Sequence, residues 1–164
     1  MTVPKATELP PFIVHENDVP EVEGHYRPPF EKEAFSWTRD LGRAAGTVNV
    51  GLGVDRLPPG RRTGFTHAHS EEEEMVYVLK GTCAVRIIEP GRPPVEYELR
   101  AGHMVAFPAG TAVAHTFVNH GDSDCFLLVV GERKEATDRV FFPEDTGYDE
   151  ATAQERPWRH WKRT

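Results

Sequence analysis

A period of two in the apolar residues begins at Thr47 and continues through most of the chain. The segment TVNVGLGVDRL places valine or leucine at every second position from Val48 to Val54, which is the spacing of a β-strand with one apolar face. Turn signals such as EPGRPP, PAG and NHGDS separate further short strand candidates. These candidates are TGFTHAH, EMVYVLK, TCAVRIIE, VEYELR, MVAFP, AHTFVN and CFLLVVGE. Many short strands at this spacing predict an all-β sandwich or barrel.

The two ends of the chain lack this pattern. Residues 1–46 are rich in proline and charge, and their only helix-like piece, Glu31 to Ala45, predicts a short helix or turn. Residues 132–164 are polar and aromatic and contain proline. We therefore expect one domain with its barrel at residues 47–131. The N-terminal arm is expected to pack around the barrel edge or onto a partner subunit, and the C-terminal arm to lie over the barrel.

Composition narrows the classes of function. The 164 residues suit a single domain, and 38% hydrophobic with 27% charged residues is typical of globular proteins. A net charge of −7 disfavours nucleic-acid binding, which needs a basic surface. The N-terminal segment does not have the pattern of a signal peptide, and no apolar run is long enough to span a bilayer. We expect a cytoplasmic protein that binds neither nucleic acid nor membrane.

Two histidines and an acid suggest metal chemistry. In HAHSEEEEMVYVLKG, His67 and His69 stand one residue apart, so on a strand both imidazoles project to the same side. Imidazole nitrogens and carboxylate oxygens bind borderline divalent metals. Glu74 opens the next strand, and a third histidine, His115, follows the turn signal FPAG much later in the chain. Together these four residues predict a metal site.

The run of four glutamates leaves one choice open. Glu74 is in phase with the valines of the strand that it opens, so it is the favoured ligand. Glu73 is the alternative, because a loop can shift the register by one residue. Glu71 and Glu72 are interpreted as a solvated turn.

Two longer motifs resemble those of the cupin family. The first has the form HxH, four residues, Glu, six residues, Gly, and consists of His67, His69, Glu74 and Gly81. The second lies in GHMVAFPAGTAVAHTFVN and consists of Gly102, Pro108, Gly110, His115 and Asn119. Four residues separate Gly110 from His115 where the usual pattern has two, but this preserves strand parity. A subset of single-domain cupins carries the same PAGTxxAH sequence motif.

The resemblance implies a double-stranded β-helix, a small jelly-roll barrel. It also implies a metal held in the barrel mouth by His67, His69, Glu74 and His115. Such a ligand set suits Fe, Mn, Ni, Zn or Cu, and the spacing does not choose among them.

Several functions are compatible with this fold, because a fold does not determine a reaction. Our first hypothesis is a small metal-dependent enzyme that acts on a small polar metabolite, as a dioxygenase, an isomerase or epimerase, or a lyase. The alternative is a non-catalytic module that binds a sugar or an anion. No residue outside the ligand set stands out as a general base. We also expect a homodimer, because small cupins tend to pair through sheet edges and the arms cannot fold alone.

Overall fold

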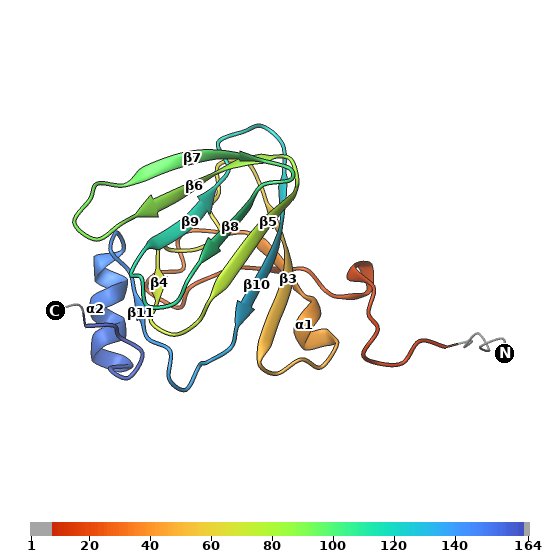
Figure 1. The fold of residues 1–164 in the computed structure, drawn as a ribbon, viewed down its shortest axis with the longest axis horizontal. Coiled ribbons are helices and arrows are strands. Elements are labelled where there is room, and N and C mark those ends of the chain that lie inside the picture. The colour runs from red at the N-terminus through yellow and green to blue at the C-terminus, as the bar shows by residue number, and fades with distance from the viewer. Residues whose placement is uncertain (1–7, 163–164) are drawn as a thin grey trace.

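Two antiparallel sheets face each other in the computed structural model, which describes residues 8–162 (Figure 1). The larger sheet has six strands, and the chain crosses between the sheets so that neighbouring strands are distant in sequence. In spatial order they are β1 (Val22–Glu23), β2 (Trp37–Asp40), β3 (Val50–Leu57), β10 (Cys125–Glu132), β5 (Glu74–Lys80) and β8 (Met104–Phe107).

The remaining elements complete the barrel and its surroundings. The second sheet consists of β7 (Val95–Arg100), β6 (Thr82–Ile88) and β9 (Ala114–Val118). A two-stranded ladder joins β11 (Val140–Phe141) to β4 (Ala68–His69). The helices are a short 3-10 turn (Glu16–Asp18), α1 (Leu41–Ala44) and α2 (Thr146–Glu155). This arrangement confirms the predicted all-β jelly-roll fold.

Strand β5 has the alternation that its sequence predicts. Val76 and Val78 are fully buried in the core between the sheets, where they pack with Leu127 of β10. Met75 and Tyr77 point to the outer face, where they are 47% and 41% exposed. Glu74, which precedes them in phase with the valines, therefore faces into the barrel.

Strand β3 has its apolar series on the outside. Asp55 lies directly opposite Leu127, whose side chain is fully buried in the core, so the odd-numbered residues of β3 face inward. The alternating apolar residues of Val50–Val54 consequently form the outer face. The inward positions near the start of β3 are Gly51 and Gly53, so this part of the inner wall carries no side chains.

The N-terminal arm differs from the prediction of a helix or turn over Glu31–Ala45. Its central part is strand β2, which pairs with the edge of β3, and only α1 is helical. The Asp40 carboxylate caps α1 by accepting a hydrogen bond from the Arg43 backbone at 2.8 Å. Pairing with β3 satisfies the backbone hydrogen-bonding groups of β2. The local sequence does not show this partner, so the strand could not be predicted from it.

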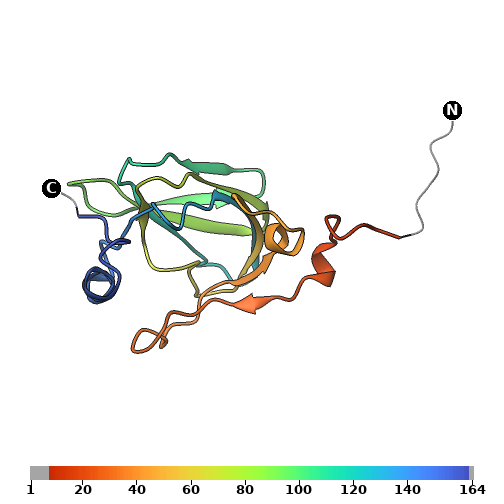
Figure 2. The same ribbon diagram turned by 90° about the horizontal axis from the view of Figure 1, so that it is seen from below.

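Aromatic packing joins the two arms. Tyr26 of the N-terminal arm stacks on Phe65 with 4.0 Å between ring centroids, and Phe30 meets Tyr148 of α2 edge-on at 5.1 Å. The segment between β1 and β2 thus reaches α2 at the far end of the barrel (Figure 2). Helix α2 itself was not predicted from sequence, because TGYDEATAQE has no apolar residues at a helical period. None of the described helices is long and apolar enough to span a membrane.

Candidate metal centre

The four residues predicted as ligands converge at one end of the barrel. One ligand atom each of His67, His69 and Glu74 lies within 4.8 Å of the others. The His115 ring centroid is 5.0 Å from that of His67, and its Nε2 lies 3.4 Å from Glu74 Oε1. His67 immediately precedes β4, His69 lies in β4, Glu74 begins β5, and His115 lies in β9.

Backbone pairing and aromatic stacking set the positions of His67 and His115. Each donates a backbone hydrogen bond to the carbonyl of the other, at 3.1 Å and 2.8 Å, which aligns the two side chains on one face. Phe107 stacks on the His115 ring with 3.4 Å between centroids and 6° between planes. The His115 ring is therefore fixed in orientation and only 2% exposed.

Hydrogen bonds define which ring nitrogens face the cluster. His67 Nδ1 donates to the Phe65 carbonyl at 2.8 Å, because a carbonyl oxygen can only accept. His69 Nδ1 donates to the Asp138 carboxylate at 2.7 Å. Each Nε2 is then left as the metal-binding nitrogen, in the arrangement common for histidine ligands.

Electrostatics favour the metal-binding protonation states of His67 and Glu74. Burial, together with the neighbouring His69 and His115, lowers the pKa of His67 to about 3, so its imidazole is neutral at neutral pH. Burial alone would raise the pKa of Glu74, but contact with His115 and the nearby histidine charges lower it to about 2. A neutral imidazole and an ionised carboxylate are the forms that bind divalent metals. For His69, burial lowers the pKa, but the Asp138 carboxylate and the nearby glutamates outweigh it and raise the pKa.

The cluster also passes a test of fit. Both ring nitrogens of His115 are buried and have no hydrogen-bond partner among residues 8–162, which is costly unless another group occupies the site. A cavity of about 10 Å³ adjoins His69, Glu74 and His115. Borderline divalent metals accept such a set of imidazoles and a carboxylate, so the residues present fit a metal ion.

Two further acids lie beside the cluster and were missed in the sequence. Asp138, from the loop before β11, is buried and accepts hydrogen bonds from His69 and from the Glu71 backbone, the latter at 2.9 Å. The interpretation of Glu72 as part of a solvated turn is wrong. Its side chain is largely buried 3.6 Å from His69 Nδ1, because the Lys134 backbone N–H donates to it and holds it against the C-terminal arm. Glu71 and Glu73 are exposed.

A hollow of about 320 Å³ is lined by residues of β2, β3 and β10, among them Gly51, Gly53 and Gly131. Gly131 is directly opposite Glu74 in the β10–β5 ladder, and a β-carbon added at Gly131 would lie 3.9 Å from Glu74 Cγ. Together with Gly51 and Gly53, Gly131 leaves this part of the wall bare. The volume suits a small metabolite.

Asp55 is the buried acid of this hollow. Its carboxylate accepts hydrogen bonds from Thr38 Oγ1 at 2.7 Å and Ser36 Oγ at 3.0 Å, and no cation pairs with it among the described residues. Burial, aided by the charge of Glu74, raises the pKa of Asp55 to about 6 against the pull of these hydrogen bonds. Buried acids without a cation are costly, and they concentrate at functional sites.

The fold and the cluster define a class: a small jelly-roll barrel with histidines and a carboxylate gathered inside its mouth. Residues 53–131 match the family model of the cupin domain, and the chain belongs to the cupin superfamily. Among curated proteins, none matches the chain closely enough to serve as a relative.

Three solved structures are similar to this chain in fold and sequence. A sugar phosphate isomerase of the cupin superfamily from Silicibacter pomeroyi is 26% identical with a TM-score of 0.69, covering 80% of this chain and 82% of its own. A candidate sugar phosphate isomerase from Acidithiobacillus ferrooxidans has the same identity and TM-score, with 81% of each chain covered. The polyketide cyclase RemF from Streptomyces resistomycificus is 26% identical with a TM-score of 0.59, covering 89% and 94%.

Proposed function

We propose that this cupin is a metal-dependent isomerase acting on a small polyhydroxylated carbonyl compound such as a sugar or its phosphate. The observation that carries the proposal is the hollow of about 320 Å³ that contains the buried Asp55 and is lined by Gly131, the residue opposite Glu74. Two similar structures named for sugar phosphate isomerisation support the substrate class. An isomerisation moves only protons within the substrate, so it needs no second substrate site.

Each residue has a role in this proposal. His67, His69, Glu74 and His115 would hold one divalent transition metal, which when bound supplies a Lewis acid for a carbonyl or hydroxyl oxygen. Asp55 would take a proton from the hydroxyl-bearing carbon beside the carbonyl and return it to the carbonyl carbon, while the proton of that hydroxyl passes to the carbonyl oxygen. A pKa of about 6 suits a general base at neutral pH. Thr38 holds the Asp55 carboxylate in the wall of the hollow.

The test combines metal loading with isotope exchange. Metal-free protein is reloaded separately with Fe(II), Mn(II), Ni(II), Zn(II) and Cu(II) and incubated with aldoses, ketoses and their phosphates in heavy water. Nuclear magnetic resonance then detects the isomer and deuterium at the exchanged carbon. We expect turnover with at least one metal, and none in His67→Ala or His115→Ala. The exposed His120, which pairs with Glu96 outside the site, gives a matched control in His120→Ala.

Three results would count against the proposal. Stoichiometric metal in both His67→Ala and His115→Ala would mean that the ligand assignment is wrong. A sugar that binds in a metal-dependent manner and is never converted would favour the alternative, a non-catalytic binding module. Oxygen consumption without isomerisation would favour the oxygenase chemistry that other cupins carry out.

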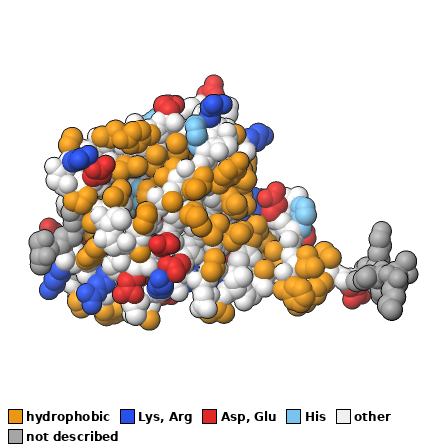
Figure 3. Space-filling view, viewed as in Figure 1, with side chains coloured by type: hydrophobic (Ala, Val, Ile, Leu, Met, Phe, Trp, Pro, Cys, Tyr) orange, Lys and Arg blue, Asp and Glu red, His pale blue; other side chains and the backbone are white. Residues whose placement is uncertain are grey.

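We also propose a homodimer. Met75, Tyr77 and Met104 form an exposed apolar surface on the outer face of the larger sheet, because Tyr77 lies directly opposite Met104. Figure 3 shows hydrophobic side chains gathered over β5, β8 and β10. Exposed apolar patches of this kind mark association surfaces. Light scattering should give the mass of a dimer at micromolar concentration and of a monomer for Tyr77→Lys; a monomeric parent protein would refute the proposal.

A further inference from the structure

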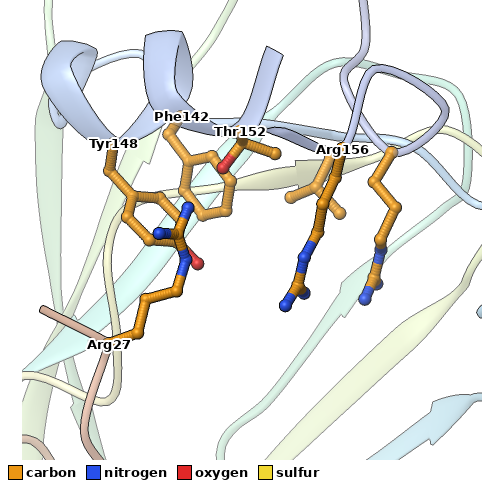
Figure 4. A pocket seen from close by; sticks show the side chains of 7 residues that line it. Arg27, Phe142, Tyr148, Thr152 and Arg156 are labelled. Carbon is orange, nitrogen blue, oxygen red and sulfur yellow. The ribbon is translucent and has the colours of Figure 1, made fainter. Parts of the chain in front are cut away.

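A second cavity lies between α2 and the N-terminal arm, with a volume of about 110 Å³ (Figure 4). That volume corresponds to roughly three or four water molecules. Phe142 and Tyr148 form an apolar wall, with their rings edge-to-face at 4.9 Å. The cavity is therefore large enough for one small group and is shielded on one side from solvent.

The charge of this cavity is positive. Arg27, Arg156 and Arg159 line it and no acidic side chain does, in a chain whose net charge is −7. Both terminal nitrogens of Arg27 pair with the Glu155 carboxylate, Nη2 with Oε2 at 2.6 Å and Nη1 with Oε1 at 3.1 Å, so the charge of Arg27 is already compensated. Figure 4 shows Arg27 reaching the cavity from the N-terminal arm, on the side opposite α2 and Arg156.

Several donors around the cavity have no acceptor. Within residues 8–162, the guanidinium groups of Arg156 and Arg159 make no hydrogen bond and no ion pair within 4.0 Å, although the charge of Arg159 acts on Glu72. Among the same residues, the Thr152 hydroxyl makes no hydrogen bond either. The Thr152 hydroxyl is directed into the cavity (Figure 4). Most other arginines of the barrel and arms are paired with carboxylates, for example Arg62 with Glu33 at 2.7 Å. Arg156 is exposed and Arg159 half-buried, and donors without a protein acceptor that line one cavity are available to an anion.

This cavity is separate from the hollow beside the metal centre. Strand β11 lies between the cavity and β4: Val140 lines the cavity and pairs with His69 in the ladder. The Phe142 ring, which also lines the cavity, lies 6.1 Å from the His67 ring between centroids. A group bound here would contact the segment that braces the ligand strand without entering the barrel.

We propose that this cavity binds a small oxyanion, a phosphate or carboxylate group, through Arg156, Arg159 and the Thr152 hydroxyl. Guanidinium forks match the oxygens of both groups in a bidentate manner. The oxyanion is either a free inorganic ion or the anionic end of a metabolite. The proposal does not depend on the isomerase reaction, since it concerns a different cavity.

Isothermal titration with inorganic phosphate tests the proposal, at constant ionic strength set by chloride. We expect saturable binding in the parent protein. In the double variant Arg156→Gln/Arg159→Gln the affinity should fall at least about tenfold, because charge-assisted hydrogen bonds to the anion are lost. Arg92→Gln is the matched control, since Arg92 is exposed and pairs only with Glu89 in a turn. Arg159→Lys, which keeps the charge but not the fork, should weaken binding less than Arg159→Gln.

Further titrations separate the sources of the anion. Glycerol phosphate that binds more tightly than phosphate would assign the site to a metabolite, and equal or weaker binding would assign it to a free anion. Unchanged circular dichroism and melting temperature of the variants show that they are folded; if the double variant does not fold, Thr152→Val with Arg159→Lys replaces it. Three results would overturn the proposal. They are the absence of saturable binding, binding that Arg92→Gln weakens equally, and full affinity in the double variant.

Discussion

Replacing Asp55 by asparagine should make the protein more stable at neutral pH. The pKa of Asp55 rises from its ordinary 3.8 to about 6, chiefly because the carboxyl is buried. A rise of this size corresponds to roughly 3 kcal/mol of unfavourable free energy for the ionised form in the folded state. Asparagine keeps the shape and one oxygen acceptor for Thr38 but carries no charge at any pH.

The pH dependence distinguishes this cause from others. Well below pH 3.8 the carboxyl is protonated in both the folded and unfolded states, so the penalty is absent. As the pH rises, the unfolded chain ionises first, and the folded protein loses stability until the pH has passed about 6. The stability advantage of Asp55→Asn should therefore grow from a small fraction of its full value at pH 4 to nearly its full value at pH 7.

Thermal unfolding of the metal-free proteins measures this advantage. Allowing for weaker hydrogen bonds to the amide, a gain of roughly 2–3 kcal/mol at pH 7 raises the melting temperature by about 4–12 °C for a chain of this size. Asp122→Asn, at an exposed turn residue, serves as the control and should show no such trend. The same Asp55→Asn protein should bind metal and lose turnover. A stability difference that is equal at pH 4 and pH 7, or a destabilised variant at pH 7, would refute the reasoning.

Three further predictions concern the metal centre and its neighbouring hollow. Glu74→Gln should lose metal by elemental analysis whereas Glu73→Gln should not, because only Glu74 faces the histidines; equal loss in both would contradict the assignment. Asp138→Asn should weaken metal affinity roughly 10–100-fold in a chelator competition, since the carboxylate orients His69, and unchanged affinity would exclude that role. Gly131→Val should raise KM with full metal content, because the side chain would enter the hollow; unaltered kinetics would place the substrate elsewhere.

Much of the barrel could be predicted because its strands are encoded locally. The predicted segments EMVYVLK, VEYELR and CFLLVVGE coincide with β5, β7 and β10. Alternation within β5 also explains why Tyr77 lies on the face away from the cluster. Turn signals and a period of two act over a few residues, so one sequence is enough to read them.

The parts that were missed depend on contacts between distant segments. Strand β2 is defined by its pairing with β3, and the buried state of Asp55 by Ser36 and Thr38 from the N-terminal arm. Asp138 reaches His69 from a loop far along the chain. The four predicted ligands do lie together, but that they bind a metal stays a prediction, as do the homodimer and the cytoplasmic location.

The contact between Asp138 and His69 has a consequence for where this protein can be divided. The stretch that matches the cupin family ends at Gly131, before Asp138 and before β11 is added to the ligand strand. A chain trimmed to the family boundaries would keep every residue of both motifs, yet His69 would lose the group that fixes its ring. The C-terminal segment therefore acts as part of the scaffold of the histidine cluster. The region that carries both motifs is smaller than the unit that must be kept intact when the protein is expressed or its site is transplanted.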